Sequence, residues 1–326
     1  MLANIISKNI GIDLGTASVL VYVSGKGIVI REPSVIAVDA SGKTVAFGGE
    51  ARGMLGRTPE NITAVRPLRS GVISDFSMTE RMLKHYIRKA EGGHIMKPSV
   101  VICVPCLASE VEKRAASDAA SAAGARRVKL IKEPVAAAIG AGIDINKPCG
   151  RMVIDIGGGS SDIAVISLGG IVVNSTVFCA GDSFDEAIRR YVRKNYNITI
   201  GSRTAEDIKI KIGSVDENAE GEMRVSGLGL LSGLPENFVI TSKDVRQALM
   251  PCAERIVDSV KCVLESTPPE LISDINAHGI LMTGGGSLLS GISELIGKST
   301  GISAYVAKDA ASCVAIGAGL AAEKSV

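Results

Sequence analysis

The sequence predicts an α/β protein built from two related halves that share one ligand-binding cleft. The first observation is the stretch 152–166, where an apolar run reaches Asp155, a turn of glycines and serines follows, and a second apolar run leads away. The second observation is a copy of this pattern at residues 10–23, which contains Asp13. The two aspartates are 155 − 13 = 142 positions apart, which is about the length of one domain.

Each glycine turn has the composition of a phosphate-binding hairpin. The consecutive glycines at 157–159 can turn tightly and expose backbone N–H groups to an anion, and Ser160 can donate its hydroxyl to the same oxygens. The carboxylate of Asp155 would repel a phosphate unless a cation lay between them, which indicates a hydrated Mg²⁺ ion. One such turn could equally be an ordinary connection between core strands, but two matched copies favour a nucleotide site.

Two further segments supply residues to the same predicted cleft. Lys132-Glu133-Pro134 follows a short apolar run and opens a helix. A carboxylate at Glu133 can orient the water that attacks a γ-phosphate, or it can be a plain charge at a helix N-terminus. Later, an apolar run passes through Thr283 into three glycines, Ser287 and Leu288, where bare backbone can pack against a base or a ribose phosphate.

Composition and charge exclude several classes of function. The 326 residues carry a net charge of +2, spread along the chain, so there is no electrostatic basis for binding nucleic acid. No apolar run approaches the roughly 18 residues of a spanning helix and no signal peptide opens the chain, so we expect a cytoplasmic protein.

We interpret the seven cysteines as buried free thiols, although Cys103 and Cys106 form a C-x-x-C pair. The segment 291–299 resembles a Walker A loop, but it has one residue too many between its glycines.

The remaining patterns predict the elements around the cleft. Residues 19–48 predict a β-meander, and residues 48–70 predict a small inserted lobe. The other predicted elements are helices at 77–90, 109–124 and 242–265, a helix opening at Pro134, a helix capped by Ala180-Gly181-Asp182-Ser183, a helix starting near Arg203, strands at 99–105 and 128–131, and a β-excursion over 214–240 with turns at Gly227, Gly229 and Gly233.

One loop carries apolar residues where a loop tip is usually polar. Ile95 and Met96 lie in a glycine- and proline-containing loop over residues 91–98. They either fold back onto the body of the protein or face a membrane. The apolar N-terminal residues could assist membrane contact, although each alone would bind lipid only marginally; they are Met1, Leu2, Ile5 and Ile6.

Taken together, these motifs resemble the actin and heat-shock chaperone ATPase superfamily. Within it the chain resembles the bacterial actin homologues of the MreB family from end to end, with features of the Mbl branch. The segments that carry the resemblance include Asp13-Leu-Gly-Thr-Ala17, Glu32-Pro-Ser34, Glu133-Pro134, Val153-Ile-Asp-Ile-Gly-Gly-Gly159, Arg203-Thr-Ala-Glu206, Thr267-Pro-Pro-Glu-Leu271 and Thr283-Gly-Gly-Gly286.

The resemblance implies an actin-like ATPase fold. In this fold, duplicated ribonuclease-H-like domains surround a nucleotide cleft, and each domain carries a small inserted subdomain. We expect domain I to span 1–146, with an insert at about 33–72, and to be completed by 310–326. We expect domain II to span 147–309, with an insert at about 183–243.

The resemblance also implies a function. It indicates a slow ATPase whose subunits assemble into paired filaments at the inner face of the cytoplasmic membrane. Such filaments direct sidewall peptidoglycan synthesis and rod shape together with the cell-wall elongation machinery. A soluble metabolic kinase of the same superfamily is the alternative.

Roles for individual residues follow from the same resemblance. Asp13 and Asp155 would organise Mg²⁺ through water, and Glu133 would position the attacking water, so Glu133 and Asp155 are the expected catalytic residues. Ile95 and Met96 are the expected membrane contact. The other expected ATP contacts are Gly15, Thr16, Ala17, Ser18, Gly157, Gly158, Gly159, Ser160, Glu206, Asp207, Ile208, Lys209, Gly284, Gly285, Gly286, Ser287 and Leu288.

Overall fold

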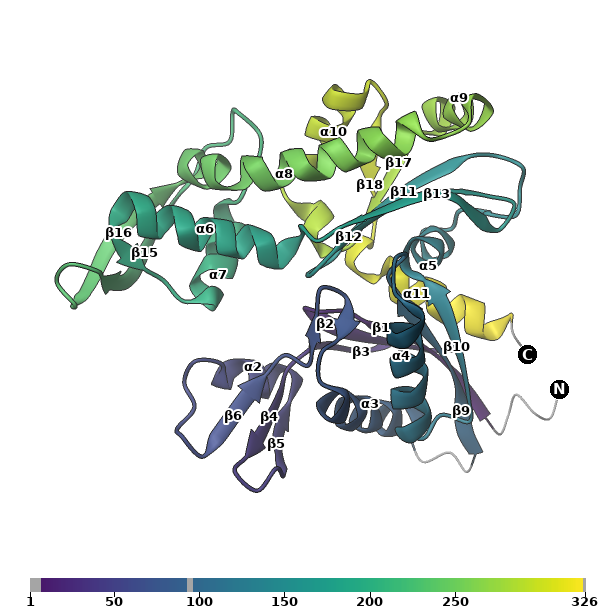
Figure 1. Cartoon of the computed structure of the whole chain (residues 1–326), viewed down its shortest axis with the longest axis horizontal. Coiled ribbons are helices and arrows are strands. Elements are labelled where there is room, and N and C mark those ends of the chain that lie inside the picture. The colour runs from purple at the N-terminus through teal and green to yellow at the C-terminus, as the bar shows by residue number, and fades with distance from the viewer. Residues whose placement is uncertain (1–6, 93–95, 325–326) are drawn as a thin grey trace.

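The computed structural model describes residues 7–92 and 96–324, which form two halves of similar topology (Figure 1). The first half contains a five-stranded sheet of order β10-β9-β1-β2-β3. In this sheet β1, β2 and β3 are antiparallel neighbours, while β9 and β10 continue the sheet in parallel with β1. The strands are β1 (Ser7–Leu14), β2 (Ser18–Val23), β3 (Gly27–Pro33), β9 (Met96–Val104) and β10 (Arg127–Lys132).

The second half repeats this arrangement in a sheet of order β13-β12-β11-β17-β18. Here β11, β12 and β13 are antiparallel neighbours, and β17 and β18 continue in parallel with β11. The strands are β11 (Arg151–Ile156), β12 (Ser161–Ser167), β13 (Gly170–Val177), β17 (Ile280–Thr283) and β18 (Ala304–Val306). The duplication predicted from two short glycine patterns is therefore a duplication of whole sheets.

Two alanine-rich helices, α5 (Glu133–Gly140) and α11 (Cys313–Glu323), pack against each other between the sheets. Helix α11 also contacts β1 and β9 of the first sheet, while α5 contacts β11 and β12 of the second. Their backbones approach closely because glycines lie at the crossing. A Cβ atom on Gly317 would overlap the carbonyl of Ala136, and one on Gly140 would overlap the carbonyl of Cys313.

The outer faces of the sheets are covered by longer amphipathic helices. The first sheet packs against α3 (Phe76–Glu91) and α4 (Glu110–Ala122), and the second packs against α6 (Gly181–Tyr196) and α8 (Ser242–Glu265). The apolar face predicted for the first of these helices is confirmed, because Met82, Leu83, Tyr86 and Ile87 are all buried. Within residues 7–92 and 96–324, no helix is long and apolar enough to cross a membrane.

A small lobe is inserted in each half. The first contains a sheet of order β5-β4-β6 and a short helix, and the second contains a sheet of order β14-β15-β16 beside another helix. Their elements are β4 (Ile36–Asp39), β5 (Thr44–Phe47), α2 (Gly48–Met54), β6 (Ile62–Val65), β14 (Ile198–Thr199), α7 (Ser202–Ile212), β15 (Glu222–Gly229) and β16 (Pro235–Thr241). The remaining elements are β7 (Leu68–Arg69), β8 (Val72–Ile73), α9 (Pro269–His278), the 3₁₀ helices η1 (Gly285–Leu288) and η2 (Ala310–Ser312), and α10 (Ile292–Thr300).

The structure corrects three local predictions. The predicted meander over 19–48 is divided, because β4 and β5 leave the first sheet and pair within the small lobe. Gly227 lies inside β15 rather than at a turn. Glycine is required there because a side chain would collide with Ile198. The start of α6 has no side-chain cap, and Asp182 forms an ion pair instead.

The close crossing of α5 and α11 makes a testable prediction. The substitution Gly317→Ala should lower the free energy of unfolding by about 1–3 kcal/mol, because the added methyl group forces the two helix backbones apart. Gly297→Ala in α10 is the matched control, since its Cβ atom would have no neighbour closer than 3.5 Å. That change should instead stabilise the protein by roughly 0.5–1 kcal/mol. Urea unfolding of both variants measures the difference, and equal effects would contradict the packing argument.

Candidate functional site

The turns between β1 and β2 and between β11 and β12 face each other at the junction of the halves. Both are closed by the same hydrogen bond, from Gly15 N to the Ser18 carbonyl oxygen (3.1 Å) and from Gly157 N to the Ser160 carbonyl oxygen (2.9 Å). The turns also touch, because a Cβ atom on Gly158 would lie 2.6 Å from the Cβ atom of Ala17. Glycine at this position therefore allows the two hairpins to approach.

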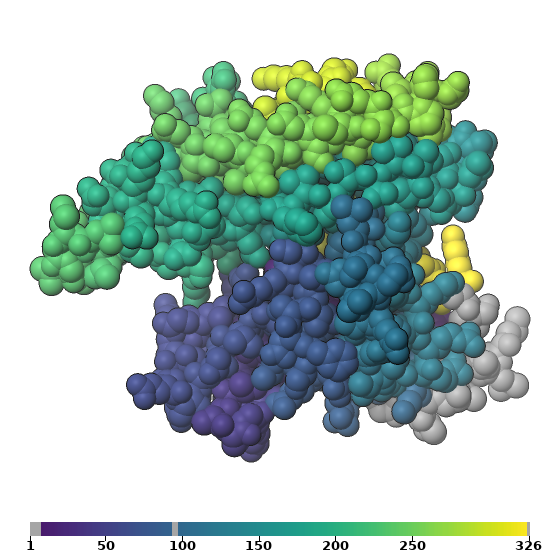
Figure 2. Space-filling model, in the orientation of Figure 1, coloured from purple at the N-terminus to yellow at the C-terminus, as the bar shows by residue number. Residues whose placement is uncertain are grey.

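A cavity of about 610 Å³ lies between the halves and is lined by both turns. Its mouth opens where the surface is hollowed between the two small lobes (Figure 2). Most of the sequence-predicted site residues line it, namely Asp13, Gly15, Thr16, Ala17, Ser18, Glu133, Asp155, Gly157, Gly158, Gly159, Ser160, Glu206, Lys209, Gly284, Gly285, Gly286 and Leu288.

Three predicted contacts are placed elsewhere. Ile208 is fully buried in the core of the second half, and Asp207 does not line the cavity. Ser287 is also buried, and its hydroxyl donates to the Gly284 carbonyl oxygen (2.7 Å), which closes the 3₁₀ turn η1. The neighbouring Ile210 and Lys211 line the cavity instead.

Acidic side chains that line the cavity include Asp13 from β1, Asp155 from β11 and Glu133 from the first turn of α5. Asp162 does not line it, but lies opposite Asp155 in the register of β11 and β12. Thr283 Oγ1 donates to Asp155 Oδ1 (2.7 Å) and fixes that carboxylate. Asp162 Oδ1 accepts hydrogen bonds from Cys106 N (2.8 Å) and Thr176 Oγ1 (2.7 Å). Its other oxygen has no hydrogen-bond partner among the described residues.

Burial and mutual repulsion make these groups hard to ionise. Burial, with the charge of Asp155 in addition, raises the pKa of Asp13 to about 7. Burial raises the pKa of Asp155 to about 6, although the hydrogen bond from Thr283 opposes the shift. The pKa of Glu133 is raised well above its ordinary value by burial and by the charges of Asp162, Asp155 and Asp13. A cation in the cavity would reverse these effects.

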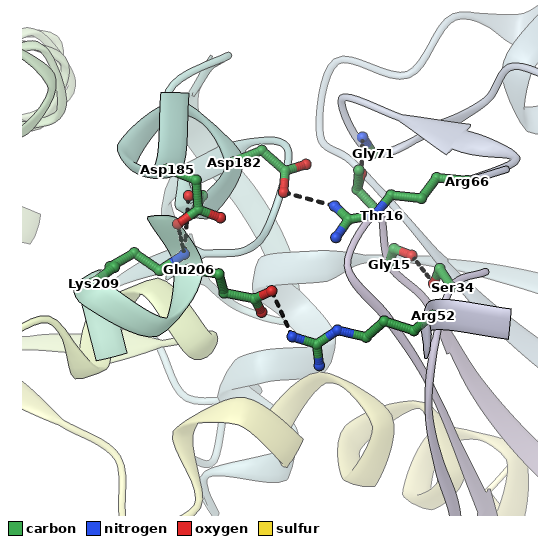
Figure 3. A network of polar contacts seen from close by, with 11 residues as sticks. Gly15, Thr16, Ser34, Arg52, Arg66, Gly71, Asp182, Asp185, Glu206 and Lys209 are labelled. Carbon is green, nitrogen blue, oxygen red and sulfur yellow. Dashed lines mark hydrogen bonds and ion pairs between the residues drawn. The ribbon is translucent and has the colours of Figure 1, made fainter. Parts of the chain in front are cut away.

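Two ion pairs span the mouth of the cleft, as Figure 3 shows. Arg52 Nη2 of the first half lies 2.5 Å from Glu206 Oε2 of the second, and Arg66 Nη1 lies 3.0 Å from Asp182 Oδ1. Sequence reasoning missed both arginines, because they come from the small lobe and from the chain just after it, and no motif connects them to the cleft.

Lys209 is oriented by residues of its own half. Its Nζ atom lies 2.8 Å from Asp185 Oδ1 and donates to the Gly181 carbonyl oxygen (3.1 Å). Burial raises the pKa of Asp185 to about 6, and the ion pair with Lys209 opposes that shift. Gly181 N in turn donates to the Gly157 carbonyl oxygen (3.1 Å), so Lys209 is linked to the second glycine turn.

Most of the predicted membrane residues lie outside the ranges 7–92 and 96–324. Ile95 lies outside the described residues, as do Met1, Leu2, Ile5 and Ile6. Met96 is the first residue of β9.

All seven cysteines are free, as the sequence indicated. Four are buried and Cys262 is exposed, so the interpretation of every cysteine as a buried thiol is wrong for Cys262. Cys149 and Cys252 are intermediate. Within the described ranges, no group of three or more His, Cys, Asp or Glu side chains is arranged to hold a metal ion directly.

Comparisons with known proteins agree with this architecture. A family model described as MreB/Mbl protein matches residues 7–326. The cell shape-determining protein Mbl of Bacillus subtilis is 50% identical over 317 residues, which cover 96% of this chain and 95% of the relative. The cell shape-determining protein MreB of Escherichia coli K12 is 49% identical over 325 residues, covering 97% of this chain and 94% of the relative.

Solved structures give the same result. The crystal structure of MreB5 of Spiroplasma citri bound to ADP matches with a TM-score of 0.93 and 39% identity, covering 98% of this chain and 97% of that chain. The structure of the same protein bound to AMPPNP matches equally well.

The duplicated sheets and the cleft between them define an actin-like fold, which confirms the fold class expected from the sequence. The chain belongs to the MreB/Mbl family. The identities to Mbl and MreB are nearly equal, so they do not separate the two branches.

The buried carboxylates predict how stability depends on pH. The folded protein without metal or nucleotide holds protons on Asp13 and Asp155 up to pH values of about 7 and 6, whereas the unfolded chain releases them near pH 4. The free energy of unfolding should therefore fall as the pH rises; the two aspartates account for about 1–2 kcal/mol of this fall between pH 6 and pH 8, and Glu133, whose pKa is also raised, adds to it. Thermal unfolding in a chelator measures this slope. The substitution Asp13→Asn should flatten it, and an unchanged slope in that variant would contradict the assignment.

Proposed function

We propose that this chain is an ATP-dependent, actin-like cytoskeletal protein that polymerises into filaments and determines cell shape. The observation that carries the proposal is the pair of glycine turns facing one cavity of about 610 Å³ above buried carboxylates. The names of relatives about 50% identical to this chain support the role in cell shape. The nucleotides in the MreB5 structures support a nucleotide ligand.

The cavity fits a nucleotide with Mg²⁺ better than a bare metal ion. Among the described residues, no three His, Cys, Asp or Glu side chains are arranged to bind a metal ion directly. This suits Mg²⁺, which commonly keeps several water ligands and binds through one or two carboxylates and the phosphates of its substrate. Asp13 and Asp155 are the carboxylates that would hold the hydrated ion, which would neutralise phosphate charge. Backbone N–H groups of the two turns would bind the phosphates, and the backbone around Gly285 would face the adenosine.

Glu133 is the residue we assign to water positioning. Its side chain is only 9% exposed and lines the cavity from the first turn of α5, between the two glycine turns. A carboxylate in this place accepts a hydrogen bond from water and orients it toward the terminal phosphate, which requires position more than strong basicity. We therefore propose slow ATP hydrolysis coupled to filament turnover.

A metabolic kinase is not favoured, because the relatives that cover nearly the whole chain are cell shape-determining proteins.

Self-association into paired filaments has a candidate surface in the second small lobe. The turn between β15 and β16 exposes apolar side chains, with Leu231 91% exposed and Leu234 63% exposed. A second subunit would cover these leucines, because exposed apolar clusters commonly mark interaction sites.

We further propose that the filaments lie in the cytoplasm at the inner membrane face and act with the cell-wall elongation machinery. This placement rests on the apolar pair Ile95 and Met96 and on the apolar N-terminal residues.

Hydrolysis is tested at Glu133. The variant Glu133→Ala should bind Mg-ATP with unchanged affinity but release phosphate at least about 100-fold more slowly, because the attacking water loses its orienting group. Asp155→Ala is the contrasting variant, and it should weaken Mg-nucleotide binding by about 10–100-fold. Phosphate release and nucleotide titration separate the two effects. Unchanged turnover in Glu133→Ala would remove this residue from the proposed role.

Polymerisation and membrane contact are tested together. Purified protein with anionic liposomes should form filaments on lipid only when Mg-ATP is present, as seen by co-pelleting and negative-stain microscopy. A variant carrying Ile95→Ser and Met96→Ser should still polymerise but remain in the bottom fraction of a lipid flotation gradient, apart from the floating liposomes. Nucleotide binding without filaments at any concentration would overturn the cytoskeletal proposal, and unaltered lipid binding by the variant would move the membrane contact elsewhere.

A further inference from the structure

A second cavity, of about 640 Å³, adjoins the glycine turns and is not used by the proposed nucleotide site. It shares Thr16, Arg66, Gly159 and Asp182 with the first cavity, and its walls come from both halves of the chain. Residues of the first small lobe and the segment after it form one wall. Helices α6 and α8 form the other wall, which includes the side chain of Cys252.

Two thiols meet at this wall. Cys252 lies in α8 and is partly exposed, while Cys179 lies just before α6 and is fully buried. The Cys179 thiol donates to the backbone carbonyl oxygen of Cys252 (3.4 Å), and the Cys252 thiol donates to the backbone carbonyl oxygen of Ser183 (3.9 Å). No disulfide joins them, so the pair is a dithiol with one member facing a cavity and the other directly beneath it.

The surroundings of the pair favour a thiolate at Cys252. The neighbouring thiol of Cys179, followed by the charges of Arg255 and Arg190, lowers the pKa of Cys252 to about 7 against the opposing effect of burial. Both arginines line the same cavity. Two acids also line it, but Glu186 is paired with Arg190 and Asp182 with Arg66. A thiolate of this kind is the reactive form of cysteine.

We propose that Cys252 and Cys179 form a thiol modification site, at which a hydroperoxide oxidises Cys252 and Cys179 then closes a disulfide. In the first step the Cys252 thiolate attacks one peroxide oxygen, the O–O bond breaks, and the departing oxygen takes up a proton. Cys252 is then a sulfenic acid. In the second step the Cys179 sulfur attacks the Cys252 sulfur, the S–O bond breaks, and hydroxide leaves with the Cys179 proton as water. The two sulfurs together lose two electrons, which reduce the peroxide.

The disulfide would connect α8 to a segment that supports the second glycine turn. Ser161 Oγ donates to the Cys179 carbonyl oxygen (2.6 Å), and Asp182 N donates to the Gly158 carbonyl oxygen (2.8 Å). The residues between Cys179 and Asp182 are therefore held against the turn that faces the cleft. Disulfides in reducing compartments are commonly transient or redox-sensing, which suits a reversible modification at this position.

The test treats the full-length protein with hydrogen peroxide, blocks the remaining thiols with iodoacetamide, and maps the peptides by mass spectrometry. We expect a Cys179–Cys252 cross-linked peptide and the loss of two hydrogen atoms per chain, before oxidation of the more exposed Cys262. In the variant Cys179→Ser, we expect a sulfenic acid at Cys252 that dimedone traps. In Cys252→Ser, Cys179 should be consumed at least roughly tenfold more slowly, because it lacks its activated partner.

Cys262→Ser is the matched control, because it removes the exposed thiol and should leave the cross-link unchanged. The proposal would be overturned if Cys262 were oxidised while Cys252 stayed reduced in the wild-type protein. Equal loss of the Cys179 thiol in wild type and Cys252→Ser would overturn it as well. Neither result depends on nucleotide binding or polymerisation, so the test is independent of the proposed function.

Discussion

The cost of withdrawing several neighbouring carboxylates from water is the constraint on which the cleft depends. Asp13, Asp155 and Glu133 come from separate segments of the chain. Burial raises the pKa of each, and the charge of at least one neighbouring carboxylate adds to each shift. Burying charges of one sign costs free energy unless a cation compensates it. A Mg-nucleotide would supply that cation together with phosphates for the glycine turns. The proposed ligand therefore completes an arrangement that the protein alone leaves electrostatically unbalanced.

The contacts between the halves differ in kind from the floor of the cleft to its mouth. At the base, α5 and α11 cross closely through Gly140 and Gly317, so the halves share a packed core there. At the mouth the contacts are ion pairs such as Arg52 with Glu206, whose side chains are partly exposed. Partly exposed ion pairs contribute little and exchange readily with water. The geometry thus favours opening at the mouth about a firm base, which is what entry of a nucleotide requires.

Local sequence patterns predicted much of the candidate site, because its proposed phosphate-binding groups are backbone N–H groups in glycine turns. Turns such as Gly157–Gly159 require glycine at particular spacings, and those spacings are visible in the chain. The same reasoning failed where a long side chain reaches from a distant element, as with Arg66. The family resemblance assigned Ile208 and Ser287 to the ligand, whereas the first packs in the core and the second closes a 3₁₀ turn. Periodicity shows which face of a helix is apolar, but not which polar neighbours point into a cavity.

The sequence by itself determined the fold class, the two hairpins and the position of Glu133 before a helix, because these depend on strand, turn and helix signals within a few residues. Only the tertiary structure decided which charges meet. It placed Arg52 against Glu206, and it brought Cys179 and Cys252 into contact although they are 73 residues apart. It also divided the predicted meander between two sheets. Such contacts join distant segments through the packing of whole helices and sheets, and no short pattern records them.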